Sequence, residues 1–201
     1  FKGGTGTSSR RLSILGQGYT VGVLVQCNYG LRNRLSVAGV PVGQEIADLL
    51  PCYSALPDGS FAGPRHCGAT GGSSPDELGS IIVVIATDAP LLPHQLKRVV
   101  KRAALGIGRM GGIGGNSSGD IFVAFSTANP AADRADSLVS WQAIPNEQIN
   151  PLFEATVDAT SEAILNAMLA AETMTGADGF RVYALPHDRL LATLRKYGRL
   201  P

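Results

Sequence analysis

The pattern of apolar and polar positions predicts a layered α/β domain. Residues 81–86 and 121–125 are short apolar runs bounded by polar, turn-rich sequence. Runs of this length, rich in β-branched residues, are typical of strands buried on both faces of a sheet. The same pattern predicts further strands at 19–26, 31–37 and 180–185.

Helical periodicity predicts two long helices between these strands. Residues 96–107 carry apolar side chains at i, i+3, i+4, i+7, i+8 and i+11, and residues 151–173 show one apolar face. Shorter helical segments are expected at 45–50 and 186–196. Helices alternating with buried strands indicate helical layers that cover sheets.

Two stretches show no clear period. Residues 1–18 are rich in glycine, serine and threonine and are expected to be irregular apart from a short apolar patch at 12–15. Residues 51–78 carry much glycine, proline and serine. Because loops of this length are unusual inside compact domains, this stretch is expected to be functional or a flexible tail.

Composition fits one globular domain and excludes several classes of partner. The 201 residues are 44% hydrophobic and 16% charged, with 17 Lys and Arg against 16 Asp and Glu, a net charge of +1. That balance provides no electrostatic attraction toward nucleic acid or an anionic membrane. No apolar stretch is long enough to span a bilayer. The chain begins at Phe1 and not at methionine, so we expect it to be the later part of a longer precursor, cytoplasmic or alternatively periplasmic.

The sequence gives no support for a metal or nucleotide site. Cys27, Cys52 and Cys67 show no CxxC spacing and are expected to be free thiols, with one disulfide as the alternative. The three histidines have no ligand spacing, and no metal or organic cofactor is expected. Gly106 to Gly111 satisfies GxGxxG, but it lies where a helix is expected to end, so it predicts a helix terminus and not a dinucleotide site.

The step from Gly79 to Ser80, at the start of the 81–86 strand, suits one particular chemistry. A serine that attacks the carbonyl just before it breaks the chain and becomes an N-terminal nucleophile whose amine lies beside its own hydroxyl. The alternative is a plain turn entering a core strand, and the dipeptide alone favours the turn.

Further polar residues stand at the ends of the predicted strands. Ser118 and Asp120 precede the strand at 121–125, so in adjacent strands they would emerge at the same rim as Ser80. A hydroxyl tied to a carboxylate can accept and relay the nucleophile's proton, and Asn28 offers an amide N–H to a developing oxyanion. Asp120 as a strand-entry residue and Asn28 as a turn residue are the structural alternatives.

Taken together, these segments resemble the self-processing serine aminopeptidases typified by DmpA, which include the β-peptidyl aminopeptidases. The resemblance covers nearly the whole chain except 51–78. It is carried by residues 2–10, 19–30, 39–43 and 185–199, and most specifically by Gly-Ser-Ile-Ile-Val-Val-Ile-Ala-Thr-Asp-Ala-Pro at 79–90 and Ser-Gly-Asp-Ile-Phe-Val-Ala-Phe-Ser-Thr-Ala-Asn at 118–129.

The resemblance implies a four-layer αββα sandwich similar to N-terminal nucleophile hydrolases. It implies self-cleavage between Gly79 and Ser80, so that 1–79 ends one subunit and 80–201 forms the other. It further implies Ser80 as nucleophile, Ser118 and Asp120 as its activating partners, and Asn28 in the oxyanion hole. Asp120 stands where some relatives carry glutamate, and its shorter arm alters its reach to Ser118.

The same resemblance implies the substrates and the assembly. The substrates would be short peptides, aminoacyl amides or esters, including D- or β-aminoacyl compounds. The assembly would be a tetramer of cleaved heterodimers, with no nucleic acid, membrane or cofactor as partner. Family members carry a long segment before the part that matches here, and it helps to bind the substrate's amine. One alternative is acyl transfer, as in the related ornithine acetyltransferases, although these typically use threonine as nucleophile. The other alternative is an inactive fragment.

Overall fold

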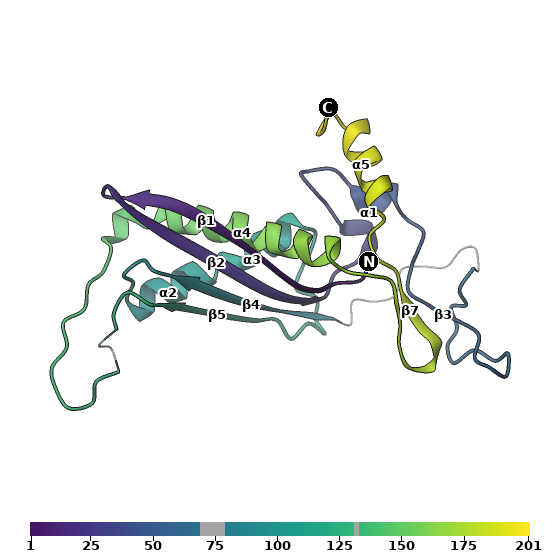
Figure 1. The fold of residues 1–201 in the computed structure, drawn as a ribbon, viewed down its shortest axis with the longest axis horizontal. Helices are drawn as coiled ribbons and strands as arrows, with labels where there is room; N and C mark the ends of the chain where they lie inside the picture. Colours follow the sequence, from purple (N-terminus) through teal and green to yellow (C-terminus); the bar gives the residue numbers. More distant parts are fainter. Residues whose placement is uncertain (69–78, 131–132) are drawn as a thin grey trace.

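The main element of the fold is a twisted four-stranded sheet. The computed structural model describes residues 1–68, 79–130 and 133–201. The strand order is β1-β2-β4-β5, with β5 parallel to β4 and the other neighbours antiparallel. The strands are β1 (Gly4–Ile14), β2 (Gln17–Asn28), β4 (Ser80–Thr87) and β5 (Ile121–Ser126) (Figure 1).

Three helices lie on one face of this sheet: α2 (Pro93–Val100), α3 (Ala103–Arg109) and α4 (Asn150–Leu169) (Figure 1). The longest, α4, runs across β1 and β2 and buries a row of small residues against them. The approach is close enough that a Cβ on Gly6 would lie 2.1 Å from the carbonyl oxygen of Ala163. The core therefore lies between the helices and the inward side chains of the strands, such as Val25, Val83 and Ile85.

The opposite face of the sheet is apolar and uncovered. Ile82 is 42% exposed and Ile121 is 55% exposed, and the neighbouring apolar side chains on this face are also open to solvent: Leu24, Val123 and Phe125. The strands predicted to be buried on both faces are therefore buried on only one face by the residues that the structure describes. An open apolar face of this extent is a surface that soluble proteins normally cover.

The two faces of β4 offer a direct test of this arrangement. Ile85→Ala removes a side chain with no exposed area, so we expect it to lower the free energy of unfolding by about 2–5 kcal/mol. Ile82→Ala, on the open face, should lower it by about 1 kcal/mol or less. Urea unfolding of residues 1–201 measures both. Equal losses would contradict the assignment and indicate that the open face is covered in solution.

A second, smaller group of elements lies beyond the end of β2 (Figure 1). It contains a three-stranded sheet in the order β3-β7-β6, formed by β3 (Cys52–Tyr53), β7 (Phe180–Val182) and β6 (Met174–Thr175). The helices α1 (Val42–Glu45) and α5 (His187–Lys196) contact each other beside it. Glu45 joins them by accepting hydrogen bonds from Lys196 and Tyr197.

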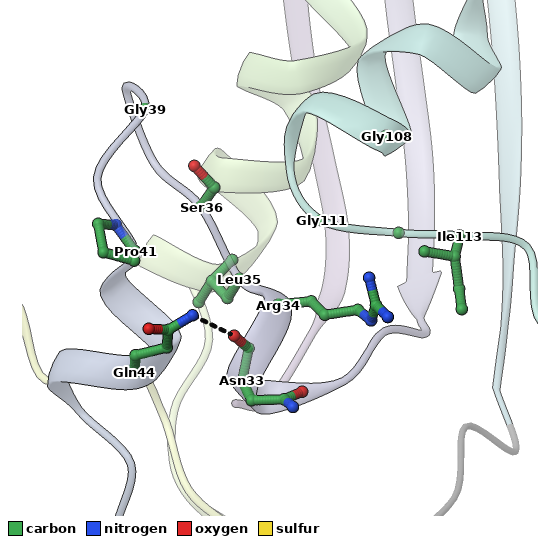
Figure 2. A pocket seen from close by; sticks show the side chains of 11 residues that line it. Asn33, Arg34, Leu35, Ser36, Gly39, Pro41, Gln44, Gly108, Gly111 and Ile113 are labelled. Atoms are coloured by element: carbon green, nitrogen blue, oxygen red, sulfur yellow. Dashed lines mark hydrogen bonds between the residues drawn. The ribbon is translucent and has the colours of Figure 1, made fainter.

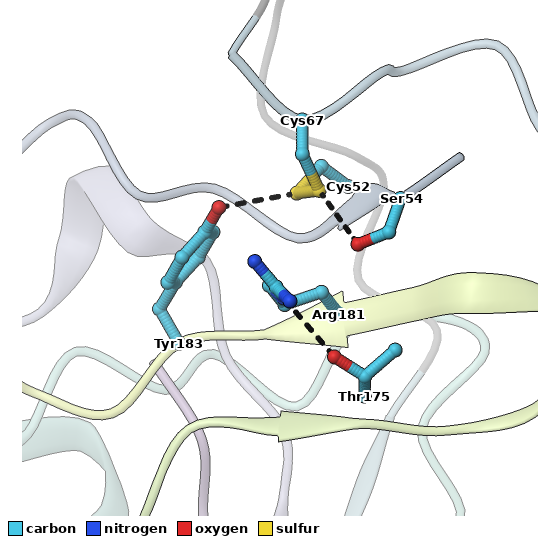
Figure 3. The surroundings of a disulfide bond; sticks show 6 residues. All are labelled: Cys52, Ser54, Cys67, Thr175, Arg181 and Tyr183. Atoms are coloured by element: carbon cyan, nitrogen blue, oxygen red, sulfur yellow. Dashed lines mark hydrogen bonds between the residues drawn. A yellow bond between two sulfur atoms is a disulfide. The ribbon is translucent and has the colours of Figure 1, made fainter. Parts of the chain in front are cut away.

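The cysteines differ from the prediction of three free thiols. Cys52 and Cys67 form a disulfide (Figure 3). Only Cys27 is free. The Tyr183 hydroxyl donates to the sulfur of Cys52 at 3.5 Å, and backbone hydrogen bonds connect Tyr53 to Arg65 and Cys67. The disulfide thus closes a loop within the 51–78 stretch, whose strand β3 pairs with β7, and residues 69–78 of that stretch lie outside the described residues.

Several predicted elements are confirmed and others are wrong. The strands at 19–26, 81–86 and 121–125, a strand at the start of 180–185 and the helices at 151–173 and 186–196 are present with shifted ends. The irregular segment predicted at 1–18 is instead the strand β1, joined to β2 by a turn in which Leu15 and Gly16 both have positive φ. The helix at 96–107 is divided into α2 and α3, and the helical turn expected at 45–50 lies earlier, at α1.

The strand predicted at 31–37 does not form, because the side chain of Arg32 is buried in the core. Residues Arg32–Arg34 form the short 3-10 helix η1, and two others follow later, η2 (Asn146–Gln148) and η3 (Ala177–Gly179). The buried guanidinium of Arg32 donates to the carbonyl oxygens of Ile46, Asp48 and Leu49. A charged side chain that must satisfy its donors inward bends this segment away from an extended path.

No helix within 1–68, 79–130 and 133–201 combines the length and apolar character needed to cross a bilayer.

Candidate active site

The candidate site lies at the end of the main sheet where β2 ends and β4 begins. Antiparallel pairing sets Ser80 opposite Asn28. Parallel pairing sets Ile82 beside Ile121, so the three residues before β5 reach the start of β4. Sheet register therefore brings together all four residues that the sequence singled out, from three separate parts of the chain.

Two hydrogen bonds connect the loop before β5 to the start of β4, and a third lies within that loop. The Gly119 N–H donates to Ser80 Oγ at 2.8 Å, and the Ile81 N–H donates to Asp120 Oδ1 at 3.1 Å. The Ser118 hydroxyl donates to the same Asp120 oxygen at 2.6 Å. Asp120 thus orients the Ser118 hydroxyl and fixes the loop against the strand that carries Ser80.

The Ser80 side chain is half-buried and lies on the same side of β4 as Ile82, because alternate residues of a strand face the same way. Its oxygen is held by Gly119. Across the described chain, neither Ser118 nor Asp120 bonds directly to Ser80 Oγ. The hydroxyl proton of Ser80 is consequently free to turn toward a neighbouring acceptor.

Asn28 is exposed at the end of β2. Its side-chain amide makes no hydrogen bond to any other residue that the structure describes, so its N–H groups remain available as donors. An uncommitted amide opposite the serine suits the role of an oxyanion donor.

Gly79 is required by close packing. A Cβ at this position would lie 1.8 Å from the carbonyl oxygen of Asn28, so any other residue would push the two chain segments apart. Gly79, which has no side chain, therefore packs directly against the end of β2.

Cys27, next to Asn28, is the other nucleophilic side chain near this end of the sheet. It is buried, and burial raises the pKa of its thiol to about 12. Since the thiolate is the reactive form of cysteine, Cys27 is inert near neutral pH. Nowhere among the described residues do three His, Cys, Asp or Glu side chains gather as a metal site.

A cavity of about 530 Å³ opens beside Gly79 and Asn28. Its buried lining includes Ile164 and Met168, which the sequence showed only as apolar positions of a helix, and Met110, which lies in the glycine-rich helix terminus. Periodicity identifies such residues as core, and it carries no signal that they line a cavity.

A second cavity of about 340 Å³ adjoins the first across the glycines at 111 and 112. Figure 2 shows it between the segment that carries Arg34 and the end of α3, with Gln44 donating to the carbonyl oxygen of Asn33. The predicted helix terminus is confirmed here, because α3 ends at Arg109 and Gly111 has a φ of 97°.

The arrangement can be compared with known proteins. The sequence profile described as peptidase family S58 matches residues 1–182. The chain belongs to peptidase family S58. The resemblance to the DmpA-type aminopeptidases drawn from the sequence is thereby confirmed.

Two curated relatives are both beta-peptidyl aminopeptidases named BapA. The protein from Sphingosinicella microcystinivorans is 52% identical over 201 residues, covering 100% of this chain and 49% of the relative. The protein from Sphingosinicella xenopeptidilytica is 44% identical over 197 residues, covering 97% of this chain and 47% of the relative. This S58 chain spans about half the length of the curated relatives that it matches.

Solved structures give the same result for the fold. The L-aminopeptidase D-Ala-esterase/amidase of Ochrobactrum anthropi, described as a variant of the Ntn-hydrolase fold, superposes with a TM-score of 0.80 at 45% identity, covering 100% of this chain and 50% of that chain. The PH0078 protein of Pyrococcus horikoshii gives 0.82 at 44% identity, covering 100% and 49%. The predicted α/β fold of the Ntn-hydrolase-like type is confirmed, and this S58 chain itself contributes one helical layer and one sheet layer.

Proposed function

We propose that this chain carries the nucleophile and the self-cleavage site of a serine aminopeptidase that releases N-terminal residues from short peptides, amides or esters. The observation that best supports the proposal is the hydrogen-bonded corner in which Gly119 holds Ser80 Oγ beside the Ser118–Asp120 pair. The names of the relatives, which are aminopeptidases, point to the same chemistry.

The first proposed reaction is cleavage of the chain itself. Ser80 Oγ attacks the carbonyl carbon of Gly79 while its proton passes to Ser118, whose own proton moves onto Asp120. The bond between the Gly79 carbon and the Ser80 nitrogen then breaks, and that nitrogen takes up the proton. Water hydrolyses the resulting ester, leaving a carboxylate on Gly79 and a free amine and hydroxyl on Ser80.

Turnover repeats this acyl chemistry on a substrate. The freed Ser80 Oγ attacks the carbonyl of the substrate's first residue, the leaving amine takes a proton, and water hydrolyses the ester on Ser80. The described geometry supports Asn28 as the donor to the oxyanion of both tetrahedral intermediates, because its amide is uncommitted and faces Ser80 across the strand pair.

Asn28→Ala should therefore lower kcat by about 10²–10³-fold, the usual cost of one oxyanion donor. Asn28→Asp is the matched control, since it keeps the shape and removes the donor, and it should lose at least as much. Steady-state kinetics on an aminoacyl p-nitroanilide measures both. Wild-type kcat in Asn28→Asp would exclude this role.

The proposed function is tested with the complete natural gene product that contains this chain. We expect intact mass spectrometry to find a break between Gly79 and Ser80, and p-nitroaniline to be released from aminoacyl anilides. Acyl transfer to ornithine without anilide hydrolysis would replace the proposal with the acyltransferase alternative. An uncut, inactive product would leave a role in assembly only.

The remaining expectations concern the whole assembly. Residues 1–79 would end one subunit and 80–201 would form the other, in a tetramer of cleaved heterodimers. The group that binds the substrate's amine is proposed to lie in the segment that family members carry before the part matching this chain, since none of the described residues that line the cavity beside Gly79 is Asp or Glu.

A further inference from the structure

The disulfide between Cys52 and Cys67 closes a loop of residues 52–67, which we call the disulfide loop. We propose that this disulfide is a redox-sensitive latch: a dithiol that reduces it releases the disulfide loop from the rest of the molecule. The inference goes beyond the proposed function, because it uses none of the residues around Ser80.

The disulfide loop has few other contacts that hold it closed. Residues 53–66 all belong to the described part of the chain, and none of them is buried. Backbone hydrogen bonds join Tyr53 to Arg65 and to Cys67, and one from the Ser54 N–H reaches the turn before β7. A segment without buried side chains opens readily by local unfolding, so the covalent link is what keeps this one in place.

The two sulfur atoms differ in their access to solvent. Cys52 is 3% exposed, whereas Cys67 is partly exposed. A thiolate that arrives from solvent therefore reaches the sulfur of Cys67 first. Attack on that sulfur makes Cys52 the leaving group.

The hydroxyl of Tyr183 favours this direction of attack. It donates a hydrogen bond to the sulfur of Cys52 at 3.5 Å (Figure 3). A donor at the departing sulfur stabilises the thiolate that forms there, and a more stable leaving thiolate departs faster. Tyr183 is thus a positioning residue for the opening of the latch.

Two electrons pass from the dithiol to the disulfide. The first thiolate of the dithiol bonds to the sulfur of Cys67 as the bond to Cys52 breaks, and the Cys52 thiolate takes up a proton. The second thiol loses its proton and attacks the dithiol's own sulfur in the mixed disulfide, so that Cys67 leaves as a thiolate and is protonated. Cys27 takes no part, because it is buried and burial raises the pKa of its thiol to about 12.

The disulfide loop borders the cavity of about 530 Å³ beside Gly79. Leu50 and Pro51, which directly precede Cys52, line that cavity, and so does Phe180 of β7. The ring of Tyr53 packs on Phe180 with 5.1 Å between the ring centroids. An open disulfide loop would therefore withdraw the support of Tyr53 from one wall of the cavity.

The latch is tested with the complete natural gene product and dithiothreitol as the dithiol. Residues 53–66 contain a single tryptic site, after Arg65, so a new N-terminus at His66 reports an open loop. We expect reduction to speed this cut by about a hundredfold, which is the loop-closure effect of a disulfide that spans 15 residues. Mass spectrometry measures the cut, and iodoacetamide should then label Cys52 and Cys67 but not Cys27.

Variants separate the latch from general effects of the reductant. Cys67→Ser should be cut at the fast rate with and without dithiothreitol, and Cys27→Ser should behave as the wild type. Tyr183→Phe should slow reduction of the disulfide by about fivefold, because the leaving sulfur loses its donor. Tyr53→Phe is the matched control, since it removes a hydroxyl that bonds neither sulfur, and it should keep the wild-type rate of reduction.

Equal rates of cutting after Arg65 before and after reduction overturn the latch, and so does a disulfide that dithiothreitol reduces only in denaturant. Equal reduction rates in Tyr183→Phe and Tyr53→Phe overturn the assignment of Cys52 as the leaving sulfur. All of these measurements can be repeated in Ser80→Ala, so the latch and the proposed function stand or fall separately.

Discussion

Ser80→Ala is expected to yield an intact chain with no measurable hydrolysis of aminoacyl anilides. The substitution removes the only atom proposed to attack both the Gly79 carbonyl and the substrate carbonyl, so both reactions should stop together. Steric effects should be small, because the side chain is half-buried and loses only an oxygen that accepts one hydrogen bond from Gly119. A denaturing gel and a p-nitroanilide assay measure the two reactions.

Ser80→Cys is the matched control, since it replaces one nucleophile with another at the same position. It should retain slow self-cleavage, which Ser80→Ala cannot. Two fragments from Ser80→Ala, with a new N-terminus at residue 80, would refute the assignment of the nucleophile.

The second large effect is expected at Asp120. Asp120→Asn keeps an oxygen for the Ile81 N–H but removes the charge that orients and deprotonates Ser118, so it should slow self-cleavage and turnover by about 10²–10⁴-fold. The melting temperature should change little, because the amide can still bind Ile81. Rates of chain cleavage after fresh translation, together with anilide kinetics, measure the effect.

Asp120→Glu distinguishes the effect of the carboxylate charge from the effect of side-chain length. It restores the carboxylate on a longer side chain and should recover more of the rate than Asp120→Asn. If Asp120→Asn cleaved itself at the wild-type rate, Asp120 would be a structural residue of the strand entry.

Much of the site was predictable because its residues stand at the ends of apolar runs. The run at 81–86 located Ser80 at a sheet rim, and the run at 121–125 located Ser118 and Asp120 at the same rim. What the sequence does not contain is the register that sets Asn28 opposite Ser80, since register depends on pairing between distant strands.

The errors have equally physical causes. β1 is rich in glycine, serine and threonine, so it lacks an apolar run, and it forms because β2 supplies a paired edge and α4 covers it. Apolar residues at 31, 35 and 37 make residues 31–37 compatible with an extended segment, whereas the buried guanidinium of Arg32 binds three carbonyl groups. The Cys52–Cys67 disulfide depends on spatial proximity, which spacing along the chain does not reveal.

The shared sheet has a consequence for the fate of the two proposed subunits. The β2–β4 ladder, from Val21 opposite Thr87 to Asn28 opposite Ser80, joins segments on either side of the proposed break, and α4 from the later segment covers β1 and β2 of the earlier one. Scission would thus leave a single cooperative folding unit that melts in one transition. Once denatured, however, the separated halves must find each other by diffusion, so recovery of the nicked form should depend on protein concentration while the intact Ser80→Ala chain regains its fold at a rate independent of it.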